Sequence, residues 1–262
     1  SNLVAVKVLD AVGIDAALDL AQALGIRSLA DRERYGLALT LGGGDVRLLE
    51  LTAAYAALAN GGHRVTPLPV LAVLDAAAWR QATAGDGAGL APFRQERRIS
   101  AAPVLDPRVA FLITDILADD HARLPAFGEG SVLNLGRPAA AKTGTTTDFR
   151  DNWTVGYTPD LVAGVWLGNA DNSPMEHISG ITGAGPIWHD LMQEALRGRP
   201  PRDFPRPGGL RRQEVCTAAG LLPTPDCPHR AREWFIAGTE PRRPDPSYIA
   251  IAVDSASGAA WD

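Results

Sequence analysis

One short stretch of the sequence combines residue types that could bind an anion. Lys142, Thr143, Gly144, Thr145 and Thr146 place a cation, hydroxyl groups and an unobstructed backbone in succession. If the stretch is an edge strand, these groups suit a bound carboxylate and a developing oxyanion. A glycine in such a strand removes the side chain that would keep a ligand off the backbone.

The residues that follow indicate the sheet that would hold this stretch. Asp148-Phe149-Arg150-Asp151 is typical of a turn, and residues 153–158 alternate bulky and small side chains, as a second strand would. Residues 161–168 suit a third strand. We expect Asp148 and Asp151 to fix the turn and Arg150 to pair with either of them.

The remaining elements predict a mixed fold. Helices come early in the sequence, a strand cluster follows, and a helix closes the order, which favours α/β or α+β with a largely antiparallel sheet. Capping residues are expected at Asp45 and Asp106, and a helix end at Gly25. The predicted helices cover residues 4–12, 15–24, 46–60, 109–117 and 185–196, and the other predicted strands cover 69–75 and 248–253.

Composition excludes several classes of function. The net charge is −5 and no Lys/Arg cluster is interleaved with aromatic residues, which argues against a nucleic-acid surface. No apolar run approaches the ~18 residues needed to span a bilayer, and no signal peptide opens the chain. The abrupt start and end of the sequence predict a piece of a longer protein.

No motif for a cofactor or metal stands out. Neither lysine, Lys7 or Lys142, follows a glycine, so Gly42-Gly43-Gly44 is no phosphate loop. Gly183-Ala184-Gly185 lacks the third glycine of a dinucleotide fingerprint, and no histidine lies in a His-Glu-x-x-His motif. We therefore expect no cofactor and no metal.

The two cysteines leave alternatives open. Cys216 and Cys227 bracket a Gly/Pro-rich loop and could form a disulfide in an oxidising compartment. They could equally be two unlinked thiols. With His229 they could contribute to a zinc site, although no fourth ligand is evident.

The context of Lys142-Thr143-Gly144 makes it specific. Residues 142–151, together with Trp153 and residues 155–159, strongly resemble the third active-site motif of bifunctional (class A) penicillin-binding proteins. The similarity covers about the first two hundred residues and implies the penicillin-binding-protein/serine β-lactamase-like transpeptidase fold, an antiparallel sheet flanked by helices. Further matching stretches are residues 41–46, 51–62, 162–169 and 183–192.

The C-terminal residues resemble the 1C subtype of that family. The similar stretches are residues 214–216, 220–224, 227–229 and 233–241. We therefore expect residues 1–198 to be the C-terminal portion of a transpeptidase domain. Residues 199–213, rich in Pro, Arg and Gly, would be a linker, and residues 214–262 the loop-rich start of a C-terminal domain.

The resemblance implies a serine acyl-enzyme mechanism whose nucleophile is missing from this chain. Such enzymes use Ser-x-x-Lys, Ser-x-Asn and Lys-Thr-Gly to cross-link D-alanyl-D-alanine stem peptides, and penicillin stalls the acyl-enzyme. Ser-x-x-Lys would need serine at Val4 or Ala139. We therefore expect an N-terminally truncated fragment that is inactive by itself and whose helices expose apolar faces.

Roles follow by resemblance. Asn2 would be the asparagine of Ser-x-Asn, unless Ser1-Asn2 is chance or foreign sequence, and Lys142 would orient the ligand and tune the catalytic hydroxyls. Thr143 and Thr145 would bind the substrate carboxylate, with Thr146 also counted among the substrate-binding residues. The Thr145 N–H would donate to the oxyanion, a contribution of ~3 kcal/mol. Gly144 would let the substrate add as a β-strand.

The resemblance also implies partners and location. It implies peptidoglycan stem peptides and β-lactams as ligands, cell-wall synthesis proteins as partners, and an extracytoplasmic (periplasmic) site. The complete protein would be anchored in the inner membrane by a segment absent here and would also be a glycosyltransferase. The alternatives are a non-catalytic module that binds peptidoglycan or a partner and, less favoured, a β-lactamase.

Overall fold

The fold is organised around a three-stranded antiparallel sheet. The computed structural model describes residues 2–70, 72–73, 93–94 and 101–251. The strands lie in the order β5 (Ala140–Thr145), β6 (Asp151–Thr158) and β7 (Leu161–Gly168). The two hairpins and the turn between β5 and β6 are those that the sequence predicts.

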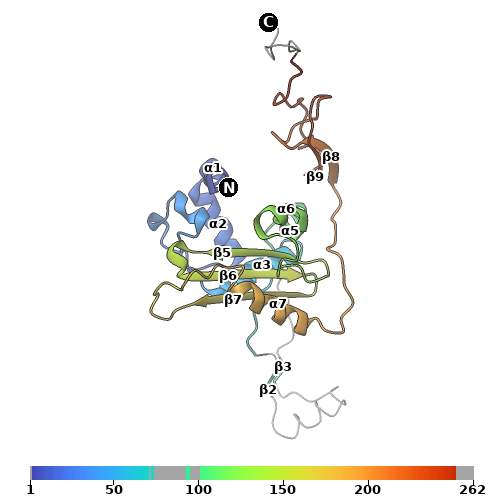
Figure 1. The fold of residues 1–262 in the computed structure, drawn as a ribbon. Coiled ribbons are helices and arrows are strands. Elements are labelled where there is room, and N and C mark those ends of the chain that lie inside the picture. The colour runs from blue at the N-terminus through green and yellow to red at the C-terminus, as the bar shows by residue number, and fades with distance from the viewer. Residues whose placement is uncertain (1, 71, 74–92, 95–100, 252–262) are drawn as a thin grey trace.

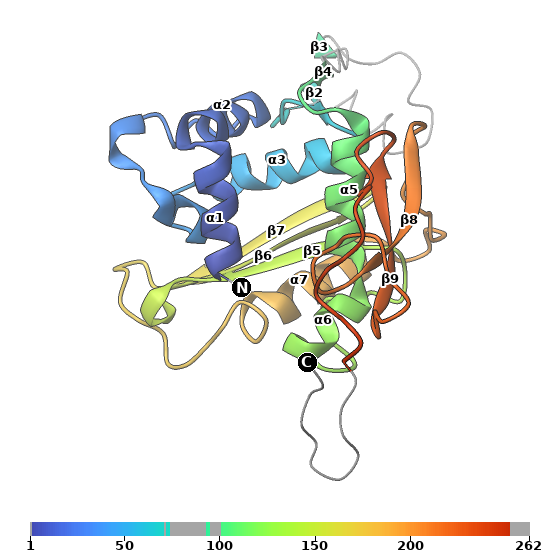
Figure 2. The same cartoon turned by 90° about the horizontal axis from the view of Figure 1, so that it is seen from above.

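Helices cover both faces of this sheet (Figures 1 and 2). One face packs against α3 and α5, with α1 and α2 on the same side, and the opposite face packs against α7. Among the described residues, every helix falls short of the length and apolar character that crossing a membrane requires. The helices are α1 (Asn2–Val12), α2 (Ile14–Leu24), α3 (Leu48–Ala59), α5 (Pro107–Ala118), α6 (Asp120–Phe127) and α7 (Ala184–Ala195).

Two of the three predicted helix boundaries are confirmed. Gly25 ends α2 with a left-handed backbone (φ 102°), and the Asp106 carboxylate accepts the Arg108 N–H at 2.8 Å at the start of α5. The predicted cap at Asp45 is wrong. Helix α3 begins at Leu48, with Arg47 in the capping position, so Asp45 precedes the first turn by too many residues to serve its free N–H groups.

Of the strands outside the central sheet, β1 to β4 have two residues each, and the longer β8 and β9 were not predicted from the sequence. Of the strand predicted at 69–75, residues 72–73 form β2, while 71, 74 and 75 lie outside the described residues. Residues 248–251 form no strand, and 252–253 also lie outside the described part. The further strands are β1 (His63–Arg64), β3 (Phe93–Arg94), β4 (Ala102–Pro103), β8 (Leu210–Cys216) and β9 (Arg230–Ile236).

The core lies on both sides of β6. On the α7 side, Trp188 is fully buried, and a Cβ at Gly156 would lie 2.5 Å from its ring. On the other side, the Tyr157 hydroxyl lies 2.8 Å from the Thr114 hydroxyl, and Tyr55 packs edge-on against the Tyr157 ring. Burial raises the pKa of Tyr157 to about 12. The central strand is thus packed tightly on both faces.

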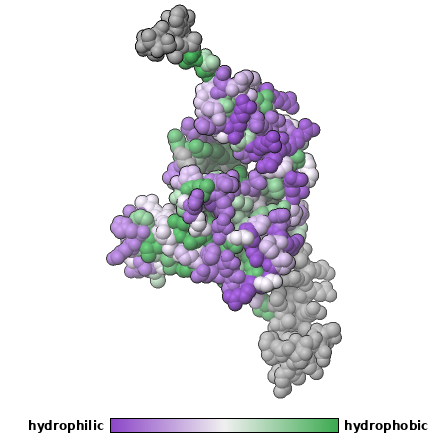
Figure 3. All heavy atoms as spheres, turned by 45° about the vertical axis from the view of Figure 1, so that its right-hand side comes forward, coloured by the Kyte–Doolittle hydropathy of each residue, from purple (hydrophilic) through white to green (hydrophobic). Residues whose placement is uncertain are grey.

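A small C-terminal module, formed by β8 and β9, lies beside α5 (Figures 1 and 2). Trp234 of β9 packs edge-on against Phe111 of α5, with ring centroids 6.1 Å apart. The guanidinium groups of Arg206 and Arg212 lie 4.9 and 5.2 Å from the centre of the Trp234 ring. Strand β8 begins at Leu210, inside the segment predicted as a linker. The surface of the module is largely hydrophilic, with an apolar hollow beneath it (Figure 3).

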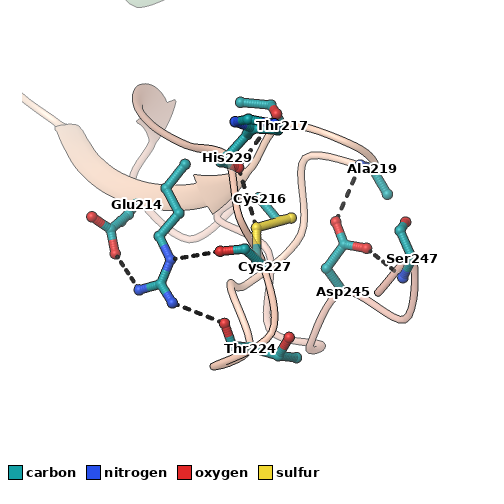
Figure 4. The surroundings of a disulfide bond; sticks show 10 residues. Glu214, Cys216, Thr217, Ala219, Thr224, Cys227, His229, Asp245 and Ser247 are labelled. Atoms are coloured by element: carbon teal, nitrogen blue, oxygen red, sulfur yellow. Dashed lines mark hydrogen bonds and ion pairs between the residues drawn. A yellow bond between two sulfur atoms is a disulfide. The ribbon is translucent and has the colours of Figure 1, made fainter. Parts of the chain in front are cut away.

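A disulfide closes this module (Figure 4). Cys216 and Cys227 are bonded, with sulfur atoms 2.07 Å apart, which decides between the alternatives that the sequence left open. The zinc alternative is wrong because both thiols are consumed, and no cluster of metal ligands exists among the described residues. Nearby, the buried Asp245 carboxylate accepts N–H bonds from Ala219 and Ser247.

The close approach of α7 to β6 predicts a large cost for a side chain at Gly156. A Cβ there would also lie 2.7 Å from the Ala140 carbonyl oxygen, so Gly156→Ala should lower the free energy of unfolding by about 1–3 kcal/mol. Gly144→Ala is the matched control, because its Cβ would meet only the Trp153 Cβ, at 3.5 Å. Chemical denaturation measures both variants. Equal stability of the two would contradict this packing.

The disulfide predicts that the C-terminal module depends on oxidation. Closing a loop with a sequence separation of 11 should contribute about 2–4 kcal/mol to the module. Reduction, or the double variant Cys216→Ser/Cys227→Ser, should therefore unfold the module at lower denaturant, as followed by hydrogen exchange of the β8 and β9 amides. The reductant should leave the double variant unchanged. If the reductant does not change the unfolding midpoint of the natural chain, the predicted contribution of the disulfide is refuted.

Candidate active site

The residues singled out from the sequence lie on the open edge of the sheet. Among the described residues, β5 pairs with a strand only through β6. The Thr146 N–H donates to the Asp151 carbonyl at 3.1 Å, and the register places Lys142 opposite Val155 and Gly144 opposite Trp153. Hydrogen bonding alternates along an antiparallel strand. The backbone groups of residues 141, 143 and 145 therefore face the open edge.

The side chains of this strand point alternately to the two faces of the sheet. Lys142 lies opposite Val155, which lies opposite Gly164, and a Cβ at Gly164 would contact Thr52 of α3. Directly opposite residues share a face. Lys142 and Gly144 therefore lie on the α3 side. The side chains of Thr143 and Thr145 share the opposite face with α7.

Lys142 carries an incompletely solvated charge. The residue is exposed, but protein atoms crowd its ammonium, and this desolvation lowers the pKa of Lys142. Its Nζ donates to the Thr143 carbonyl oxygen at 2.5 Å. An ammonium that has lost part of its water shell gains more from an incoming carboxylate than a fully hydrated one.

Gly144 is not required by the packing of the protein itself. A Cβ there would make one ordinary contact with Trp153, at 3.5 Å, and Gly144 adopts no positive φ. By contrast, a Cβ at Gly156 would clash. The packing of the described residues therefore does not require a glycine at 144.

The two threonines after Gly144 have different surroundings. The Thr145 hydroxyl accepts the Gly180 N–H at 2.9 Å and keeps its own proton available to a ligand. The Thr146 hydroxyl accepts the Asp151 N–H at 2.7 Å and donates to the Asp151 carboxylate at 3.1 Å. Thr146 therefore holds the turn, whereas Thr145 contacts Gly180, 35 residues further along the chain.

The turn between β5 and β6 is held as the sequence suggests. Asp148 and Phe149 adopt positive φ angles of 60° and 56°. The Asp151 carboxylate accepts the Trp166 indole N–H at 2.8 Å, and Arg150 lies 3.9 Å from the Asp148 carboxylate. The aspartates thus serve the turn, and Arg150 pairs with the first of them.

The helix that carries Asn2 lies on the Lys142 side of the sheet. Asn2 is the first residue of α1 and is exposed. Figures 1 and 2 show the N-terminal end of α1 above β5. The fold thus directs the two predicted catalytic elements toward one region of the surface.

Sequence reasoning missed two parts of this region. A cleft of 370 Å³ follows the end of β5 and is lined in part by Trp153 and Trp166. Residues 178–183 lie against β5 and β6 and reach Thr145 through Gly180. The two glycines of Gly180-Ile181-Thr182-Gly183 were a signal of close approach that could have indicated this loop.

Two protein families match this chain. Residues 4–193 match the family described as "Penicillin binding protein transpeptidase domain", and residues 206–250 match "Penicillin-binding protein 1A, C-terminal domain". Because the second match is to a 1A C-terminal domain, the 1C subtype predicted from the C-terminal residues is not confirmed.

Individual proteins show the same similarity. Penicillin-binding protein 2D of Bacillus subtilis (strain 168) is 32% identical over 208 residues, which are 78% of this chain and 28% of that protein. Penicillin-binding protein 1A from Haemophilus influenzae superposes with a TM-score of 0.75 at 25% identity, over 94% of this chain and 40% of that chain. PonA1 from Mycobacterium tuberculosis in complex with penicillin V gives a TM-score of 0.60 at 28% identity, over 74% and 53%. The chain therefore spans about a quarter of the curated relatives.

Desolvation of Lys142 predicts that its removal does not destabilise the fold. A base whose folded-state pKa is lowered costs stability while it is protonated, and this cost disappears as pH rises through that pKa toward the ordinary value of 10.5. Lys142→Met should therefore be at least as stable as the natural chain at pH 7. The difference in melting temperature between the two should shrink at alkaline pH. Melting temperature against pH measures this.

The matched control is Lys7→Met, which makes the same change on the exposed side of α1. The melting temperature of Lys7→Met at pH 7 should not exceed that of the natural chain. A Lys142→Met variant that is less stable than the natural chain at every pH would refute the assignment of a desolvated ammonium.

Proposed function

The chain belongs to the penicillin-binding protein transpeptidase family, and we propose that it supplies the carboxylate-binding strand of a peptidoglycan D,D-transpeptidase. One observation carries the proposal. The Lys-Thr-Gly strand is the edge of its sheet in the described part of the chain, and the backbone groups of residues 143 and 145 face outward. A peptide can pair with such an edge as an added strand.

Each residue of this strand has a role in the proposal. Lys142 attracts and orients the carboxylate of a stem peptide or β-lactam and tunes the catalytic hydroxyls. Thr143 and Thr145 donate hydroxyl bonds to that carboxylate, and Gly144 admits the ligand backbone. The Thr145 N–H is one of the two oxyanion donors, and one such donor is worth ~3 kcal/mol. Thr146 contributes indirectly, because its hydroxyl bonds Asp151.

The nucleophile is proposed to lie outside these 262 residues. Neither lysine of this chain has serine three positions before it, so Ser-x-x-Lys is lacking here. In the complete protein, Asn2 would follow the serine of Ser-x-Asn by two positions. The exposed apolar face of α1, formed by Val4, Val8 and Val12 at four-residue spacing, supports further protein packing there.

The complete protein is proposed to be an extracytoplasmic cell-wall enzyme. A disulfide such as Cys216–Cys227 persists in oxidising compartments, which supports a periplasmic site. Membrane anchorage, a glycosyltransferase activity and cell-wall synthesis partners belong to the same proposal. So does the division into a transpeptidase portion at 1–198, a linker that starts at 199, and a C-terminal region that takes in β8 from Leu210 onward, which is earlier than the predicted boundary at 214.

Acylation by a fluorescent penicillin tests the proposal. This chain should form no covalent adduct, because it holds no serine three residues before a lysine, whereas the complete protein should form one adduct per molecule. In the complete protein, Lys142→Met should slow the acylation at least tenfold, since the carboxylate loses its cation. Lys7→Met is again the control and should leave the rate unchanged.

Two outcomes would overturn the proposal. A stoichiometric, hydrolysis-sensitive adduct on this chain alone would refute a nucleophile outside it. Absence of any adduct on the complete protein would favour a non-catalytic module that binds peptidoglycan or a partner, the alternative that the sequence raised.

A further inference from the structure

The hydroxyl of Thr145 is oriented by a loop distant in sequence. Its Oγ1 accepts the Gly180 N–H at 2.9 Å across a separation of 35 residues. A hydroxyl has one proton and two acceptor sites. This bond orients the hydroxyl from the protein side, and it does not use the hydroxyl proton.

Two buried side chains of β6 hold this loop, residues 178–183, in place. The Thr154 hydroxyl donates to the Gly180 carbonyl at 3.1 Å, and the Asn152 amide donates to the Ile178 carbonyl at 2.8 Å. Both side chains are fully buried. Asn152 lies directly opposite Thr145 in the sheet, so the loop spans β5 and β6 on one face.

The loop packs so closely against the strands that a side chain at Gly180 or Gly183 would clash. A Cβ at Gly180 would lie 2.4 Å from the Gly144 carbonyl oxygen and 2.9 Å from that of Trp153. A Cβ at Gly183 would lie 2.6 Å from the Asn152 Oδ1. The loop is also stiff internally, since the Gly183 N–H donates to the Ser179 carbonyl at 2.8 Å.

We propose that Thr154 and Asn152 are positioning residues that act through the 178–183 loop on the hydroxyl of Thr145. The inference rests on the proposed function, in which that hydroxyl binds the ligand carboxylate. The chain of contacts runs from Thr154 to Gly180 and from Gly180 to Thr145. Neither positioning residue touches the ligand, because both are fully buried behind the loop.

The test uses the complete protein and the second-order rate constant of its acylation by benzylpenicillin. Thr154→Val keeps the branched shape but removes the hydroxyl, so it should lower that constant roughly 2- to 10-fold, as expected for one hydrogen bond. Thr154→Ser should restore most of the rate. Thr158→Val is the matched control, because Thr158 is a buried threonine of the same strand outside this network, and its rate should equal that of the natural protein.

A double variant separates positioning from general damage. If Thr154 acts through Thr145, then Thr154→Val should cause no further loss in a protein that already carries Thr145→Val. Hydrogen exchange at the Gly180 amide is a second measurement, which does not depend on enzyme activity. The exchange rate should increase in Thr145→Val and in Thr154→Val but not in Thr158→Val.

The possible failures differ from one another. Equal rates for Thr154→Val and Thr158→Val, or additive losses in the double variant, would overturn this inference while the proposed function stands. A natural complete protein that forms no adduct would overturn the proposed function, and the inference with it.

Discussion

The pairing of β5 with β6 is the constraint on which the rest of the site depends. Its register places Lys142 and Gly144 on one face, and it turns the backbone groups of Thr143 and Thr145 toward the open edge. A slip of one residue would exchange the two faces and hide these groups against β6. The bonds between Thr146 and Asp151 anchor this register at the turn. The orientation of the edge strand is therefore specified by hydrogen bonds within the sheet and its turn.

Glycines allow other parts of the molecule to pack closely against this sheet. Gly156 lets α7 press its buried Trp188 against the sheet, and Gly180 lets the 178–183 loop lie on the carbonyl groups of β5 and β6. Gly144 differs, because among the described residues a Cβ there would make only one ordinary contact, with the Trp153 Cβ. Gly156 and Gly180 are thus required by contacts within the protein, whereas Gly144 is not.

The C-terminal module is held by other means. It has little apolar core of its own and relies on the disulfide between Cys216 and Cys227 and on the Trp234 contacts with α5 and with two arginines. Its strands carry charged residues on both faces, so the alternation that identifies a half-buried strand is weak in β8 and β9. That is why the sequence indicated a loop-rich tail there.

The sequence by itself determined the central sheet, the turn at Asp148–Asp151, the family and the residues of the edge strand, because these depend on local alternation, turn chemistry and a contiguous motif. It left open the pairing of the cysteines and placed the cap of α3 wrongly at Asp45. Only the tertiary structure decided which face Lys142 occupies, that its ammonium is desolvated, and that Gly180 holds Thr145. These features depend on contacts between residues tens of positions apart, and such contacts leave no periodic signal in a single sequence.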